Sequence, residues 1–257
     1  MMNQSLAVGL MVSVLALSAC SSTAVRQPTR AERQQELARI QTQLALEYMK
    51  IGDFRQAVAA IDKAVVSDAK QENAWLVKAF IHQDLKQFDE AERSFQTALK
   101  LKPNSAETNN NYGWFLCSSQ NQPQTALAYF DKALADPTYP SPQIAYLNKG
   151  ICSGKLKQYG LAQAYLERTL NLSPQLGQAW KELARVFWQT GEFAQAQQAW
   201  QRYADGLQQW SAEDLWLARQ IAASNGQTAL AQQYEVQLRE QFPYSDELKN
   251  INTGQTR

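Results

Sequence analysis

The sequence predicts an all-α fold, an α-solenoid built from six helix-turn-helix units. Two amphipathic helical patterns joined by a short turn occupy residues 73–104, and a similar pair recurs about every 34 residues along the chain. Small residues recur at two fixed positions of every unit, where paired helices must come close together. A single unit of this kind cannot bury its own apolar face, so each one has to stack on its neighbours.

The first 19 residues differ from the rest of the chain. An apolar run from Leu6 to Leu17 is too short to span a bilayer and fits the central region of a secretory signal peptide. The residues Leu-Ser-Ala-Cys that end at Cys20 resemble a bacterial lipobox, which implies that Cys20 is acylated. The segment departs from the usual pattern in one respect, since no Lys or Arg precedes the apolar run. The alternative is an ordinary signal with a chance cysteine. Ser21 follows Cys20, and in Gram-negative lipoproteins this implies sorting to the outer membrane.

A polar segment follows the predicted lipidation site. Residues 20–37 are rich in Ser, Thr, Arg and Gln, and they are predicted to form a lipidated N-terminus and tether that becomes helical near Ala31. Several acyl chains on Cys20 would give stable anchoring, since the free energy of membrane binding grows with each buried methylene.

The repeating part of the chain begins after this tether. Its spacing resembles the tetratricopeptide repeat, a 34-residue helix-turn-helix, and this resemblance implies a right-handed solenoid. Repeat three ends in a linker over residues 136–142, where three prolines prevent a helix. The predicted repeats span residues 38–71, 72–105, 106–142, 143–176, 177–210 and 211–245, and a polar tail is predicted over 246–257.

Two positions within the repeats carry the strongest pattern. The two helices of a repeat approach closely at its eighth and twentieth positions, so only small side chains fit there. The eighth position reads Ala45, Ala79, Gly113, Gly150, Ala184 and Ala218, and the twentieth reads Ala57, Ala91, Ala126, Ala162, Ala196 and Ala231. Six small residues in each register are hard to obtain by chance, which favours the repeat assignment.

Neither the composition nor the motifs point to catalysis. The formal net charge is +1, so no overall field favours nucleic acid. The one histidine, His82, lies at a position that packs between helices, and without a close cysteine pair a zinc site lacks ligands. No nucleophile, metalloprotease or phosphate-binding motif occurs. The sequence therefore predicts no catalytic residue, metal, cofactor or small-molecule substrate.

Two cysteines lie within the repeats. Cys117 and Cys152 are 35 residues apart, on the first helices of repeats three and four, which are expected to stack side by side. Export would place them in an oxidising compartment, where a disulfide can persist. A disulfide that staples the irregular linker is predicted, with two free buried thiols as the alternative.

The concave face of such an array is the predicted binding surface. Its apolar row is typical of a partner site, although a tightly wound superhelix could instead cover these side chains. Leu76 and Phe80 are predicted to point into the groove without a packing role. The predicted surface turns basic toward Lys181, Arg185 and Arg219. The predicted groove residues are Leu46, Met49, Leu76, Phe80, Asn110, Asn111, Trp114, Leu147, Asn148 and Ile151.

The layout of the whole chain carries a further resemblance. A lipobox, a short tether, six repeats ending near residue 245 and a cysteine pair on the third and fourth repeats resemble the PilF/PilW family of type IV pilus biogenesis lipoproteins. This resemblance implies a pilotin, a non-catalytic lipoprotein on the periplasmic face of the outer membrane. Such a protein helps the pilus secretin to localise and to assemble into its ring, here by holding a secretin segment in the groove. The alternative is a lipoprotein adaptor that recruits a periplasmic peptidase or cell-wall hydrolase.

Overall fold

The structure is a computed structural model that describes residues 26–253. The predicted signal peptide, Cys20 and the first part of the tether lie outside the described residues. Over residues 26–253 every element of regular secondary structure is an α-helix. None of these helices is long and apolar enough to cross a membrane. The helices are α1 (Arg30–Lys50), α2 (Phe54–Ser67), α3 (Glu72–Asp84), α4 (Phe88–Leu101), α5 (Ala106–Ser118), α6 (Pro123–Leu134), α7 (Pro142–Lys155), α8 (Tyr159–Leu172), α9 (Gly177–Thr190), α10 (Phe193–Ala204), α11 (Ala212–Ser224), α12 (Thr228–Gln241) and α13 (Asp246–Thr253).

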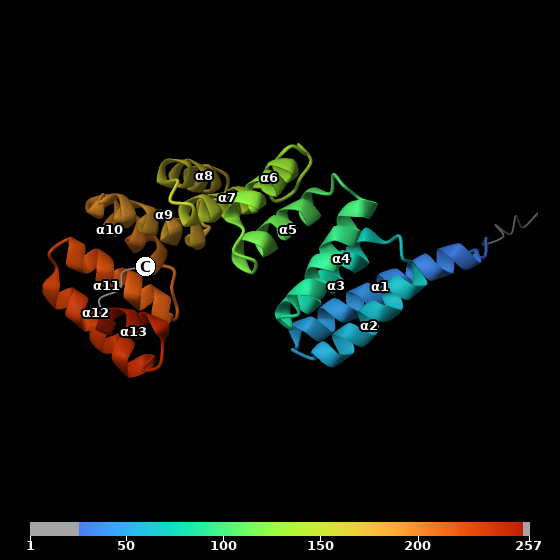
Figure 1. Cartoon of the computed structure of the whole chain (residues 1–257), viewed down its shortest axis with the longest axis horizontal. Coiled ribbons are helices and arrows are strands. Elements are labelled where there is room, and N and C mark those ends of the chain that lie inside the picture. The colour runs from blue at the N-terminus through green and yellow to red at the C-terminus, as the bar shows by residue number, and fades with distance from the viewer. Residues whose placement is uncertain (1–25, 254–257) are drawn as a thin grey trace, which may run out of the picture.

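Consecutive helices form hairpins that stack along an arc. The pairs are α1 with α2, α3 with α4, and so on to α11 with α12, which gives the six predicted repeats. Figure 1 shows these pairs following one another from α1 to the group formed by α11, α12 and α13. The all-α solenoid predicted from the repeat spacing is confirmed.

The small residues lie where the paired helices touch. Every residue at the predicted eighth and twentieth positions is buried. A Cβ atom added to Gly113 would lie 3.2 Å from the carbonyl oxygen of Ala126, and one added to Gly150 would lie 3.3 Å from that of Ala162. The eighth position of one helix therefore faces the backbone at the twentieth position of its partner, as the pattern predicts.

Replacing Gly113 with valine should lower the free energy of unfolding by about 2–3 kcal/mol, since extra methyl groups in a filled core force strain. The first added carbon would lie 2.8 Å from Cε1 of Phe130, a fully buried ring with little freedom to move. Urea denaturation measures the effect. Gly160→Val is the matched control, because a Cβ there meets nothing within 4 Å. If both variants lowered the free energy of unfolding equally, the close approach of α5 and α6 would be contradicted.

The buried side chains form separate clusters along the array. One cluster joins α1, α2 and α3, a second joins α3 to α6, and a large third one extends from α7 to α13. Helix α7 lies at the border, because Cys152 packs in the second cluster while Leu147 packs in the third. The connection between α5 and α7 therefore couples two parts of the core.

A disulfide crosses this border. Cys117 of α5 and Cys152 of α7 are bonded in the structure, with their Cα atoms 6.1 Å apart, and both side chains are fully buried. The bond joins the first helices of repeats three and four, on either side of the linker over residues 136–142.

The residues predicted as a polar tail contain a further helix. α13 packs on α11, and Leu248 is buried in the third cluster with Ile251 against it. The repeat pattern ends before this segment, so periodicity gave no reason to place a helix there. The two apolar residues three apart were the available signal, because that spacing puts them on one helical face.

Candidate functional site

The predicted groove residues divide into two sets by their burial. The buried set consists of Leu76, Asn110, Leu147 and Asn148. The partly exposed set consists of Leu46, Met49, Phe80, Asn111, Trp114 and Ile151. Only the second set keeps surface that a partner could contact in this conformation.

The structure corrects the predicted roles of Leu76, Leu147 and Phe80. Phe80 is partly exposed, but its ring packs edge-on against Phe95 with the centroids 6.0 Å apart, so it too has a packing role. Leu76 is 1% exposed and lies in the second core cluster with Phe95 and Phe115. Leu147 is 4% exposed and belongs to the third cluster. The first helix of the next repeat covers this position, so these leucines stabilise the solenoid. A charge at Leu76 would therefore unfold the protein and would not test binding.

The asparagines at the middle of the array bind each other. Asn148 Nδ2 of α7 donates to Asn110 Oδ1 of α5 over 3.1 Å, and both side chains are buried. Asn111 Nδ2 donates to the backbone carbonyl of Glu107 over 2.9 Å. Asn110 and Asn148 thus hold α5 against α7, and the prediction that their side chains line an open groove is wrong. Asn111 also lines a hollow of about 610 Å³ formed with the linker that contains Tyr139.

A groove of about 720 Å³ lies at Ile151, between α7, α8, α9 and the start of α11. Its apolar side chains are Ile151, Tyr159, Leu166, Val186 and Trp188, and its charged side chains are Lys155, Lys157, Glu182, Arg185 and Glu213. An apolar surface bordered by a few charges is the usual composition of a binding groove. We therefore take this groove, together with the partly exposed apolar row, as the candidate binding site.

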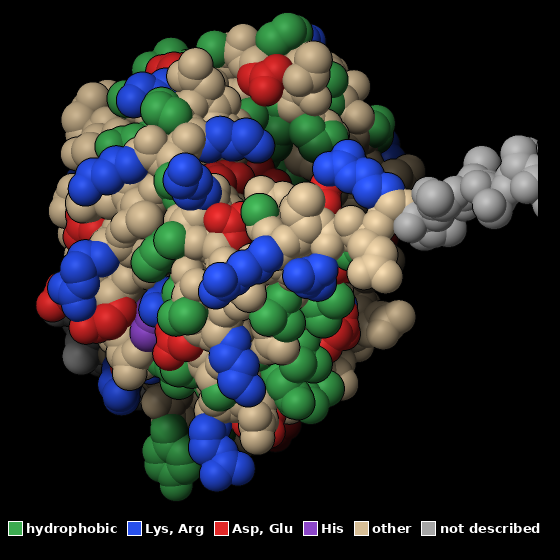
Figure 2. Space-filling model, turned by 90° about the vertical axis from the view of Figure 1, so that its right-hand side faces the viewer, with side chains coloured by type: hydrophobic (Ala, Val, Ile, Leu, Met, Phe, Trp, Pro, Cys, Tyr) green, Lys and Arg blue, Asp and Glu red, His purple; other side chains and the backbone are tan. Residues whose placement is uncertain are grey.

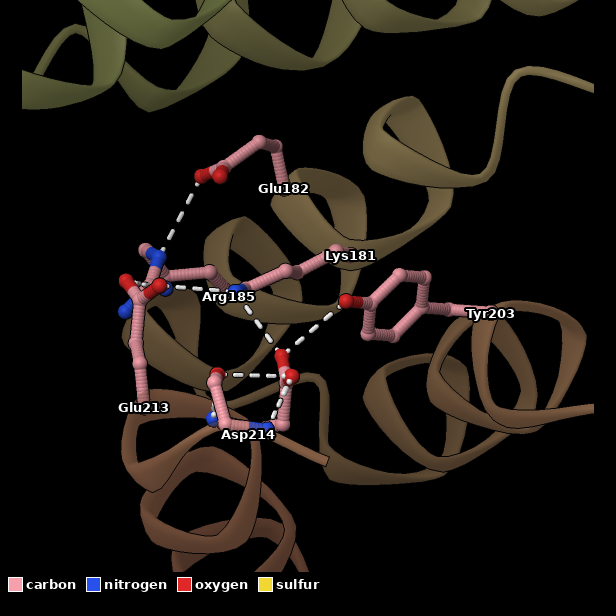
Figure 3. A network of polar contacts seen from close by, with 7 residues as sticks. Lys181, Glu182, Arg185, Tyr203, Glu213 and Asp214 are labelled. Atoms are coloured by element: carbon pink, nitrogen blue, oxygen red, sulfur yellow. Dashed lines mark hydrogen bonds and ion pairs between the residues drawn. The ribbon is translucent and has the colours of Figure 1, made fainter. Parts of the chain in front are cut away.

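Glu182, Arg185 and Glu213 of the groove lining belong to an ion-pair network between α9 and α11. Figure 3 shows this network. Lys181 Nζ of α9 lies 2.7 Å from Glu213 Oε2 and 2.8 Å from Asp214 Oδ1 of α11. Arg185 Nη2 lies 2.7 Å from the other Glu213 oxygen, and Arg185 Nε lies 3.2 Å from Glu182. The prediction of a basic surface at this end is therefore wrong for Lys181 and Arg185, since acidic side chains of the same chain neutralise both.

Arg219 behaves in the same way, because its guanidinium lies 3.3 Å from Glu235. By contrast, Lys155 donates to the carbonyl of Cys117 over 3.0 Å, and neither Lys155 nor Lys157 forms an ion pair with any described residue. The cationic character of the groove thus comes from these two lysines.

Hydrogen bonds keep the network charged. Burial by itself would raise the pKa of Asp214, but hydrogen bonds from Lys181 and Ser211 outweigh it and hold that pKa below its usual value. The pKa of Glu213 is also lowered, with burial opposed mainly by the bond from Lys181. Burial acts to lower the pKa of Lys181, and its two carboxylate partners raise it overall. Burial raises the pKa of Tyr203, which donates to Asp214, to about 12.

Sequence reasoning missed the aromatic wall of the groove. Trp188 occupies the twelfth position of repeat five, a position that the repeat pattern places on the concave face. The twelfth position of the repeat was therefore the signal that could have identified it. Tyr159 begins the second helix of repeat four, and no pattern in the sequence marked it.

The described residues contain no group of three or more His, Cys, Asp or Glu side chains that could hold a metal ion. The imidazole of His82 forms a hydrogen bond within the fold, since its Nδ1 lies 2.7 Å from Gln87 Oε1. The groove at Ile151 is thus lined by apolar side chains, by the paired charges of Glu182, Arg185 and Glu213, and by Lys155 and Lys157.

Comparison with known proteins identifies the family. The tetratricopeptide-repeat profile matches residues 42–106, 81–141 and 154–211. The type IV pilus assembly protein PilF of Pseudomonas aeruginosa is 26% identical over 236 residues, which cover 91% of this chain and 93% of that protein. An uncharacterized protein of Haemophilus influenzae is 27% identical over 147 residues, or 57% of this chain and 82% of that one.

Solved structures extend the similarity to the whole array. The crystal structure of PilW, described as a widely conserved type IV pilus biogenesis factor, is 52% identical and superposes with a TM-score of 0.78 over 84% of this chain and 98% of PilW. The structure of Pseudomonas aeruginosa PilF superposes with a TM-score of 0.76 at 26% identity, over 86% of this chain and 99% of that one. The repeats, the fold and this identity together show that the chain belongs to the tetratricopeptide-repeat family and is a homologue of the type IV pilus biogenesis proteins PilF and PilW.

Proposed function

We propose that this type IV pilus biogenesis protein is a pilotin, an outer-membrane lipoprotein that promotes localisation and multimerisation of the pilus secretin. Acyl chains on Cys20 supply the membrane address, on the periplasmic face. The repeat array is a non-catalytic scaffold that holds a segment of an unassembled secretin subunit in its groove.

The 52% identity to PilW over nearly the whole of that protein carries the pilus assignment. The groove at Ile151 supports the binding mode, because it combines apolar side chains with two lysines free of ion pairs. Such a surface could cover an apolar segment of a secretin subunit until the ring forms, which would prevent misassociation.

Replacing Ile151 with glutamate should reduce secretin multimers in the outer membrane roughly tenfold or more, since a charge at an apolar contact removes a central part of the binding energy. Ile151 is only partly buried, so the fold should tolerate the change. Detergent-resistant secretin multimers are measured in cells that carry the variant.

Leu161→Glu is the matched control, because Leu161 lies on α8 of the same repeat with half of its surface exposed and does not line the groove. Circular dichroism melting of both variants checks the fold. Normal multimers in the Ile151→Glu strain would refute the groove as the secretin site. If a peptidase or cell-wall hydrolase, and no secretin, co-purifies with the protein, the adaptor function is favoured over the pilotin function.

A further inference from the structure

An apolar stripe lies uncovered on the first helix. Leu37, Ile40 and Leu44 follow one face of α1 and are 42%, 48% and 38% exposed. Ile51, which continues the same spacing at the end of the helix, is 76% exposed. A second face, with Ala38, Thr42 and Ala45, is buried against α2 and α3. Helix α1 is therefore apolar on both faces, and one of these is open.

This face is covered in repeats two to five. Ile40 holds the third position of its repeat, and the equivalent residues Ala74, Thr108, Ala145 and Ala179 are fully buried. Repeats two to five each follow another repeat, whereas α1 is the first of the described helices. In repeat six the equivalent residue is the half-exposed Glu213, which forms ion pairs with Lys181 and Arg185 of the repeat before it. The other end of the solenoid differs, because α13 covers α11 there through Leu248. Terminal repeats need a polar outer face in water, and the open face of α1 does not meet this need.

The same segment is rich in arginine. Arg26 and Arg39 form ion pairs with Glu32 and Glu36, while Arg30 and Arg33 have no carboxylate partner in the described part of the chain. Figure 2 views the molecule from the side where α1 begins, and there apolar side chains are interspersed with Lys and Arg. Apolar side chains flanked by arginines suit the boundary between headgroups and acyl chains of a membrane with anionic lipids.

We propose that α1 is a second membrane contact, with its Leu37, Ile40 and Leu44 stripe against the acyl boundary and its arginines at lipid phosphates. The proposal rests on the acylation of Cys20 proposed above. Nine residues lie between Cys20 and Arg30, and the ten steps along the chain reach at most about 35 Å, so the anchor keeps α1 close to the bilayer. Tethering raises the effective concentration to roughly the millimolar range, at which a small apolar stripe is enough to hold the helix. The contact fixes how the solenoid stands on the membrane.

Fluorescence quenching in vesicles tests this contact. The acylated full chain is inserted into phosphatidylethanolamine–phosphatidylglycerol vesicles, with an environment-sensitive dye on Ile40→Cys. The matched control carries the dye on Val66→Cys of α2, a position that is 85% exposed. Nitroxide-labelled lipids should quench the dye at residue 40 at least threefold more than the dye at 66. Substituting Leu37→Ser and Leu44→Ser together should remove that difference, and circular dichroism verifies their fold.

Each other outcome counts against the contact. Equal quenching at both positions, with Cys20 acylated by mass spectrometry, overturns the membrane role of α1 and leaves the pilotin proposal standing. The emission of the dye at residue 40 could instead change only after purified secretin is added, or only as the protein density rises. The first result assigns the stripe to a protein partner, and the second assigns it to another copy of the chain. An unmodified Cys20 in membrane-extracted protein overturns both the anchor and the contact.

Discussion

Replacing Lys181 with methionine should lower the free energy of unfolding by about 3 kcal/mol, because removal of one partner leaves a buried charge without compensation. The Asp214 side chain is 4% exposed and would lose the cation that lies 2.8 Å away. Ser211 and Tyr203 would still donate to this carboxylate, which places the loss at the low end of the range for buried pairs. Urea denaturation at pH 7 measures the change.

The chain offers a matched control for this variant. Lys149 is as buried as Lys181, but its partner Asp131 is 61% exposed and stays hydrated when the lysine is removed. Lys149→Met should therefore cost no more than about 1 kcal/mol. If the two variants lose the same free energy, burial of Asp214 is not the cause, and the account of the network is wrong.

The ion-pair network should stabilise the fold fully only within a range of pH that has a lower and an upper limit. The pKa values of Asp214 and Glu213 are lowered in the folded protein, so their contribution is present above their unfolded values near 4 and is lost as pH falls through the folded values. The pKa of Lys181 is raised, so its contribution is complete below about 10.4 and is lost as pH rises through the folded value. The stability difference between wild type and Lys181→Met should therefore be flat between these limits and shrink outside them.

Removing the disulfide with Cys117→Ala and Cys152→Ala together should lower the free energy of unfolding by about 3–4 kcal/mol, because a bond over a loop of this length restricts the unfolded chain. The bond closes a separation of 35 residues. Alanine avoids placing a hydroxyl group in a fully buried position. Denaturation midpoints of the oxidised protein and the variant give the difference.

Reduction supplies the independent check. Dithiothreitol should bring the wild type to the stability of the double alanine variant and leave the variant unchanged. A midpoint of the wild type that does not respond to reduction, with two free thiols by mass spectrometry, would favour the alternative of unpaired cysteines. The bond is expected to matter most for α7, which is shared between two core clusters.

The sequence by itself determined the repeat architecture. Small residues at the eighth and twentieth positions fix which helices pair, since only there does backbone approach backbone, as Gly113 against Ala126 demonstrates. The cysteine pair could be assigned from the same register, because the period alone places Cys117 and Cys152 on neighbouring helices.

Only the tertiary structure decided which side of each helix is free. Leu76 and Phe80 lie four residues apart on one face, yet Leu76 is fully buried, whereas Phe80 packs against Phe95 and stays partly exposed, because coverage depends on how tightly the solenoid is wound. Lys181 and Arg185 read as a basic surface until the fold brings Glu213 and Asp214 against them from 28–33 residues away along the chain. Periodicity specifies what a helix can bury, whereas contacts between distant segments determine what it does bury.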